Sequence, residues 1–278
     1  MIMAKRFALG LKDLPRAILL LAIVAWVLVP FYFLFAVAFS PDATQIYGIS
    51  IPKNLTLENF SGIFSGYNAI WHPLFNSTII TVSTTLLALL IAVPAAYALS
   101  HLRHLKTGRG LYLSFFVLRG IPSVSLVLPF FLIFSKMHLL NTLQGLIIAL
   151  TPLALPYCVW ILRVTFDSIP REIEEAASVD GAGALQTFGK VVLPIAAPGI
   201  AAAGILSALF TYVDYMIVST LAGPSTYTFP VYITGFQEDF VTHVGPLSAA
   251  ALIGALPMLL LFGFSQGFMR RNMAAGIH

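Results

Sequence analysis

Long stretches without charged side chains dominate this sequence, and they restrict the chain to a membrane. Each of six stretches is close to the ~20 residues that a helix needs to cross a bilayer. They cover residues 17–39, 75–99, 111–134, 143–162, 196–222 and 246–268. Only 9% of the residues are charged and 59% are hydrophobic, whereas soluble domains carry about 25% charged residues. The sequence therefore predicts an all-α, polytopic membrane protein with six transmembrane helices, whose transmembrane domain spans residues 17–268.

Two local features refine this prediction. The first stretch is too long for the apolar region of a cleavable signal peptide, so we expect it to be a retained first helix. Prolines at positions 30, 94, 122, 129 and 156 lie within the stretches. Membrane helices tolerate proline when neighbouring groups satisfy the freed carbonyls. We therefore expect several of these helices to be kinked.

The basic residues predict an orientation. Twelve of the 15 Lys and Arg residues lie at the two termini or in the loops on one side of the expected membrane, Lys53 and Lys136 lie on the other side, and Arg119 lies within a span. Cytoplasmic loops carry the excess of Lys and Arg. We therefore expect a cytoplasmic N-terminus (1–16), a cytoplasmic tail (269–278) and a cytoplasmic loop at 164–195. The outer loops are then 40–73, 135–142 and 223–245.

The cytoplasmic loop 164–195 is polar and has the signals of a short helix. Pro170 suits the first helical position, and Ser168 is a candidate cap before it. Acidic residues follow in the first turns, where they complement the positive end of the helix dipole. They are Glu172, Glu174 and Glu175. We expect the helix to run to about Asp180, and a second short helix to cover 184–192.

The end and the faces of this first helix suggest a protein partner. Gly181 or Gly183 is expected to stop it. Ile173, Ala176, Ala177 and Asp180 share one face, where small side chains allow close approach and nearby carboxylates can pair with basic groups. A helix lying on lipid headgroups usually carries Lys and Arg, and anionic lipids would repel this acidic one. The pattern favours docking in a cleft of another protein.

The same loop carries a motif with fixed spacing. Glu175-Ala176-Ala177 is followed by three residues, Gly181, nine residues and then Val191-Val192-Leu193-Pro194. This resembles the EAA loop of ABC importer permeases, E-A-A-x3-G-x9-I-x-L-P, with Val191 in place of Ile. The extended segment 169–182 resembles the carbohydrate branch of that family, the MalG-like subunits.

The resemblance implies a type I ABC importer transmembrane domain in a bacterial inner membrane, with the loop helix as coupling helix. The residues it assigns to ATPase coupling are Glu172, Glu174, Glu175, Ala176, Ala177, Asp180, Gly181 and Ala182. The implied partners are a second permease subunit, two ABC ATPase subunits, an extracytoplasmic solute-binding protein, membrane lipid and a sugar-like molecule. The chain has no phosphate-binding loop of the G-x-x-x-x-G-K-S/T type. ATP and Mg are therefore expected on the partner ATPases, and this chain is not itself an enzyme and binds no cofactor.

Four residues are candidates for the substrate path. Asp214 lies within the fifth stretch between Tyr212 and Tyr215, and ionisable groups inside membranes commonly face a water-filled cavity or a partner. A structural ion pair, or solvation near the outer end of the span, is an equal alternative for Asp214. Arg119 could reach the interface, pair with Asp214, or contact an anionic solute.

The sequence disfavours nucleic-acid binding, serine catalysis and a metal site, but it leaves other transport functions open. Basic residues form no stripe for nucleic acid. Gly263 to Gly267 match G-x-S-x-G, but they lie at the end of a membrane helix rather than on a strand-turn-helix. His101 and His104 have no third metal ligand nearby. The open alternatives are a permease for a polyamine, phosphate ester or sulfonated sugar, and a stand-alone secondary transporter.

Overall fold

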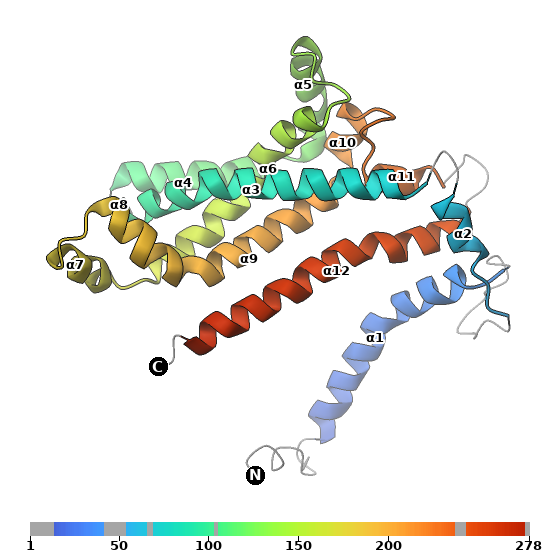
Figure 1. Ribbon diagram of the computed structural model, residues 1–278, viewed down its shortest axis with the longest axis horizontal. Helices are drawn as coiled ribbons and strands as arrows, with labels where there is room; N and C mark the ends of the chain where they lie inside the picture. The colour runs from blue at the N-terminus through green and yellow to red at the C-terminus, as the bar shows by residue number, and fades with distance from the viewer. Residues whose placement is uncertain (1–13, 42–53, 66–68, 103–104, 237–242, 276–278) are drawn as a thin grey trace. The chain divides into compact units, whose positions relative to one another are not determined.

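The computed structural model describes residues 14–41, 54–65, 69–102, 105–236 and 243–275, and all regular structure in these ranges is helical. Figure 1 shows the helices. In chain order they are α1 (Leu14–Ala38), α2 (Glu58–Phe64), α3 (Trp71–His101), α4 (Lys106–Arg119), α5 (Ser123–Lys136), α6 (Leu143–Asp167), α7 (Arg171–Val179), α8 (Ala184–Thr187), the π-helical turn η3 (Phe188–Val192), α9 (Leu193–Tyr212), α10 (Met216–Leu221), α11 (Phe229–Thr234) and α12 (Val244–Ala275).

The predicted all-α membrane fold is confirmed, but the count of six spans is not. Among the described residues, five helices are long and apolar enough to cross a membrane. They are Pro15–Ala38, Trp71–His101, Leu143–Asp167, Ala184–Tyr212 and Val244–Gly263. The expected third span, 111–134, is instead divided between α4 and α5.

Local chemistry explains the interruption of the third span. Pro122 follows Gly120 and Ile121, and its backbone is extended (φ −62°, ψ 135°). Proline has no N–H to donate, and it disfavours the helical conformation of the residue before it. A new helix then starts at Ser123. The expected fifth span is likewise interrupted, because α9 ends at Tyr212 and α10 begins at Met216.

The chain divides into two compact units, and each is described by itself. The first comprises residues 1–69 and 236–253, and α2 lies within the expected outer loop 40–73. In this unit the Asn59 side-chain amide donates to the carbonyl oxygens of Ala38 (3.0 Å) and Ser40 (2.9 Å). The Phe39 and Phe60 rings pack with centroids 4.8 Å apart. These contacts hold α2 against the end of α1.

The second unit comprises residues 70–235 and 254–278, and α3, α6 and α9 pack together in it. Small side chains fill their shared core, which lets membrane helices approach closely. The buried small residues are Ala88, Ala92, Ala96, Ala154, Cys158, Ala196 and Ala203. Within this unit α7 and α8 lie at one end of α3 and α9, and α10 and α11 lie at the other (Figure 1).

Gly199 lies where α9 packs closely against α6, which gives a stability prediction. A methyl group at Gly199 would overlap the Thr165 side chain, whereas one at Gly204 would meet nothing closer than the flexible end of Leu89, at 3.2 Å. Overpacking of a tight core costs about 1–3 kcal/mol. We therefore expect Gly199→Ala to lower the thermal unfolding temperature and the yield of folded chain. The matched Gly204→Ala should change both much less, and equal losses would contradict this account.

Candidate functional site

The expected coupling loop contains α7, and its start differs slightly from the prediction. Pro170 is the N-cap, with extended backbone, and Arg171 is the first helical residue. Ser168 is not the cap of this helix. Its hydroxyl donates to the carbonyl oxygen of Thr165 (2.7 Å), at the end of α6. Proline fits immediately before the helix because the N–H it lacks would have no partner inside the helix.

The end of α7 agrees with the sequence. Asp180 is the C-cap, and Gly181 has φ +84°, the left-handed conformation that glycine adopts without strain. The N–H of Ala182 donates to the carbonyl of Ala177 (2.9 Å), and the N–H of Gly181 donates to that of Ser178 (3.1 Å). This pair of bonds is the Schellman motif. It turns the chain sharply from α7 towards α8.

Most of the coupling residues expected from the sequence are accessible. Glu172, Glu175, Ala176, Asp180 and Gly181 are exposed, while Ala177 and Ala182 are half-buried. A hollow on the loop lies between α7 and the α8–η3 segment. Its lining residues are Ala177, Asp180, Gly181, Ala182, Gln186, Lys190 and Val191. The loop therefore offers a small, mostly acidic surface that another protein can reach.

Two apolar residues belong to this surface and were missed from the sequence. Val179 is 87% exposed and Leu185 is 86% exposed, although both are large hydrophobic side chains. In a loop expected to be cytoplasmic, such side chains are unusual unless a partner covers them. Their position in a polar segment between two membrane-length helices could have identified them from the sequence.

Glu174 differs from the other acidic residues of α7. Its side chain is only 16% exposed and is directed towards α3. The Tyr97 hydroxyl donates to Glu174 Oε2 (2.7 Å), and His101 Nε2 lies 3.0 Å from the same oxygen. Arg171 donates to Oε1 (3.3 Å). Glu174 is therefore bound within its own chain.

The structure describes the side chains of three of the four candidates for the substrate path, and their surroundings differ. The Tyr212 hydroxyl is buried and donates to the carbonyl oxygen of Gly254 (2.6 Å). Arg119 is the last residue of α4, and its side chain lies outside the described residues. Asp214 lies in the interruption between α9 and α10, where its carboxylate accepts a hydrogen bond from the N–H of Ile217 (3.1 Å). Tyr215 follows it and is 40% exposed.

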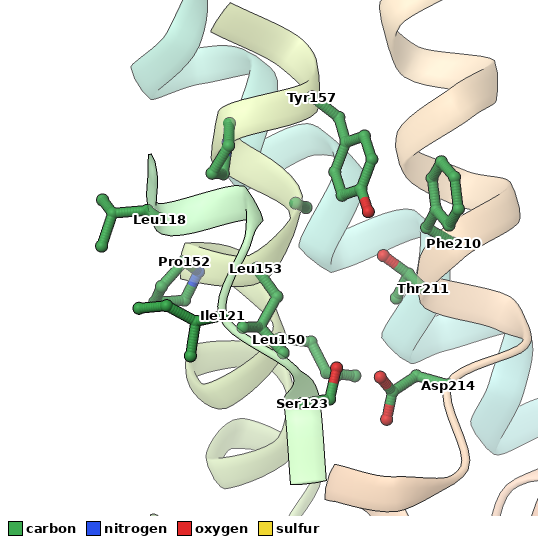
Figure 2. Close-up of a pocket in the computed structure, with 12 residues that line it drawn as sticks. Leu118, Ile121, Ser123, Leu150, Pro152, Leu153, Tyr157, Phe210, Thr211 and Asp214 are labelled. Carbon is green, nitrogen blue, oxygen red and sulfur yellow. The ribbon is translucent and has the colours of Figure 1, made fainter. Parts of the chain in front are cut away.

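A pocket in the second unit contains Asp214 and polar groups that the sequence did not single out. Figure 2 shows Asp214, Thr211 and Ser123 around its lower part, with Tyr157 and Phe210 above them. The Tyr157 and Phe210 rings are stacked, with centroids 4.2 Å apart and planes 22° apart. The pocket has a volume of about 120 Å³ and is partly open to the outside. Neither Tyr212 nor Tyr215 lines it.

The pocket lies where both helix interruptions meet α6. Ile121 and Ser123 come from the junction of α4 and α5, Asp214 comes from the junction of α9 and α10, and the rest of the lining comes mainly from α6 and α9. Non-helical backbone at membrane depth is tolerated where it is buried in protein or lines a cavity. Because this set depends on three separated segments, no local sequence pattern identified Tyr157, Phe210 or Ser123.

Comparisons with known proteins show which family and fold this chain resembles. The family described as "Binding-protein-dependent transport system inner membrane component" matches residues 85–274. The chain is 34% identical over 265 residues to the trehalose transport system permease protein SugB of Mycobacterium tuberculosis, with 93% of each chain covered. It is 36% identical over 227 residues to the sulfoquinovosyl glycerol transport system permease protein SmoH of Agrobacterium fabrum, covering 81% of this chain and 79% of that one. A solved bacterial ABC transporter that imports alginate has a chain with a TM-score of 0.77 at 22% identity, covering 93% of this chain and 98% of that one.

Proposed function

The chain belongs to the family of binding-protein-dependent transport system inner membrane components, and we propose that it is the permease subunit of an ATP-driven importer for a sugar or sugar derivative. The observation that supports the proposal most directly is the exposed surface of α7. This helix is short and acidic, with small and apolar side chains, and is exposed between the membrane-length helices that end at Asp167 and begin at Ala184. Such a surface suits a protein cleft.

The partner proposed to bind α7 is a separate ATPase. The sequence carries no phosphate-binding loop of the G-x-x-x-x-G-K-S/T type, so ATP and Mg are assigned to two partner ATPase subunits. Closure of those subunits would move α7 and, with it, the helices that flank it. A second permease subunit would complete the path, and an extracytoplasmic binding protein would deliver the solute. This arrangement places both termini and α7 in the cytoplasm, in agreement with the Lys and Arg distribution.

The pocket at Asp214 supports a sugar as the solute. Stacked aromatic rings offer an apolar face for a sugar ring, and the hydroxyls of Ser123 and Thr211 with the Asp214 carboxylate offer hydrogen-bond partners. Pockets for small molecules commonly combine apolar walls with a few polar groups in this way. Among the described lining residues, the one charged group is that carboxylate. This composition is more favourable for a neutral sugar than for a phosphate ester.

The relatives point in the same direction. The names of SugB and SmoH specify trehalose and sulfoquinovosyl glycerol, both of which contain sugar rings. SmoH also keeps a sulfonated sugar among the candidate solutes. The Asp214 carboxylate would equally attract a cation, which keeps a polyamine as the competing solute.

Uptake by reconstituted vesicles tests the proposal. Vesicles would hold the chain with its second permease and ATPase subunits, and the binding protein would be added outside. We expect uptake of labelled trehalose, or of another saccharide in a panel, that requires ATP and stops when the ATPase is omitted. Uptake driven by an ion gradient with this chain alone would contradict ATP coupling. Uptake of spermidine or glycerol 3-phosphate in preference to every saccharide would contradict the sugar assignment.

A further inference from the structure

The second unit contains a cluster of polar side chains that joins α7 to α3. It consists of Tyr97, His101, Arg171 and Glu174, and is called here the α3–α7 joint. Both carboxylate oxygens of Glu174 are engaged by the other three residues, at 2.7, 3.0 and 3.3 Å. Hydrogen bonds in which one partner is charged are about twice as strong as neutral ones. A half-buried carboxylate with both oxygens engaged therefore holds its helix in one position.

Arg171 strengthens the attachment at the end of α3. Its second guanidinium nitrogen donates to the carbonyl oxygen of Ser100 (2.9 Å), and its first also contacts His101 Nε2. The last carbonyls of a helix have no partner inside the helix, and a cation there is favourable for the helix dipole. The first residue of α7 thus completes the last turn of α3.

Aromatic packing fixes the joint from two further directions. The Tyr97 ring lies against Phe166 of α6, with centroids 5.5 Å apart, and against Phe188 of η3, at 4.7 Å. Tyr97 therefore contacts the segment before α7, the segment after it and, through its hydroxyl, α7 itself. The ring and the hydroxyl have separate roles, which single substitutions can distinguish.

Chain connectivity shows why such a joint matters. The backbone links α7 directly to α6 and, through α8 and η3, to α9, so movement of α7 reaches these helices along the chain. α3 ends about 70 residues before α7 begins and has no such backbone link. It packs against α6 and α9, and the joint adds a direct contact with α7. We propose that the α3–α7 joint makes α3 follow α7 during transport, with Glu174 as a positioning residue rather than a contact to the partner ATPase. This inference rests on the proposed function.

The test is the number of sugar molecules moved per ATP hydrolysed by the complete transporter in vesicles. Glu174→Gln keeps the shape of the side chain and removes its charge, and Tyr97→Phe keeps the ring and removes its hydroxyl. Loss of a hydrogen bond to a charged group changes an equilibrium constant by about 10-fold or more. We expect both variants to keep their ATPase subunits and hydrolyse ATP, while sugar moved per ATP falls by about that factor. Tyr112→Phe, which removes a tyrosine hydroxyl outside the joint, should leave the ratio unchanged.

A distance measurement distinguishes coupling from simple loss of folding. Spin labels on Ser178 of α7 and Leu90 of α3, both exposed, should give one narrow distance distribution with and without ATP in the native joint. In Glu174→Gln the distribution should broaden or shift when ATP binds. Unchanged sugar per ATP in both variants, or dissociation of the ATPase from Glu174→Gln, would overturn the inference. Absence of ATP-driven sugar uptake by the unsubstituted transporter would instead count against the proposed function.

Discussion

Gly181→Val is expected to abolish ATP-driven uptake while the chain still inserts into the membrane in normal amounts. Gly181 has φ +84°, a conformation that costs a side-chain-bearing residue about 1–3 kcal/mol, and valine is β-branched. Relief of this strain would break the bonds from Gly181 and Ala182 that end α7. The turn towards α8 would then change, and the surface presented by α7 would no longer fit one cleft.

The matched control is Gly183→Val, two residues further along the loop. An added Cβ has no neighbouring atom within 4 Å at either position, but Gly183 has φ −71° and ψ 163°, which valine adopts readily. We expect Gly183→Val to lose at most a small part of uptake, from a weaker cap on α8. Uptake, co-purified ATPase and the amount of chain in the membrane fraction should be measured for both variants. A similar loss at both positions would contradict the role of the positive φ.

The ends of α7 could be predicted because the determining chemistry is local. A proline before the first turn and a glycine after the last one act within a few residues of the chain, and the structure places both ends within about one residue of the prediction. Ser168 was assigned to the wrong helix because it lies within reach of two helix ends, and its sequence position does not select between them.

The remaining features depend on contacts between distant segments. The Glu174 side chain is directed towards α3 by Tyr97 and His101, which lie far from it in sequence. The sequence around Glu174 does not reveal these contacts, so Glu174 and Glu175 were both assigned to ATPase coupling. Hydropathy predicted one span at 111–134 because it does not detect that Pro122 separates two helices. The pocket needs α4, α5, α6 and α9 together, and Asp214 was its one member that the sequence identified.

Asp214 has two possible roles, which two substitutions separate. Its carboxylate accepts a hydrogen bond from the N–H of Ile217 at the start of α10, and it also lines the pocket. Asparagine keeps an acceptor oxygen for that N–H, whereas alanine removes it. We expect Asp214→Asn to leave the unfolding temperature close to native and to lower sugar uptake about 10-fold or more, because a charge-assisted bond to the solute is lost.

Asp214→Ala should lower uptake to a similar degree and also destabilise the chain by about 0.5–2 kcal/mol, the usual cost of a lost cap. Uptake rates at saturating binding protein, together with thermal unfolding of the purified chain, provide both measurements. Full uptake in Asp214→Asn combined with a lower unfolding temperature in Asp214→Ala would assign the residue to structure alone. The Tyr157–Phe210 stack would then be the part of the pocket left to recognise a sugar ring, and Phe210→Leu would become the decisive substitution.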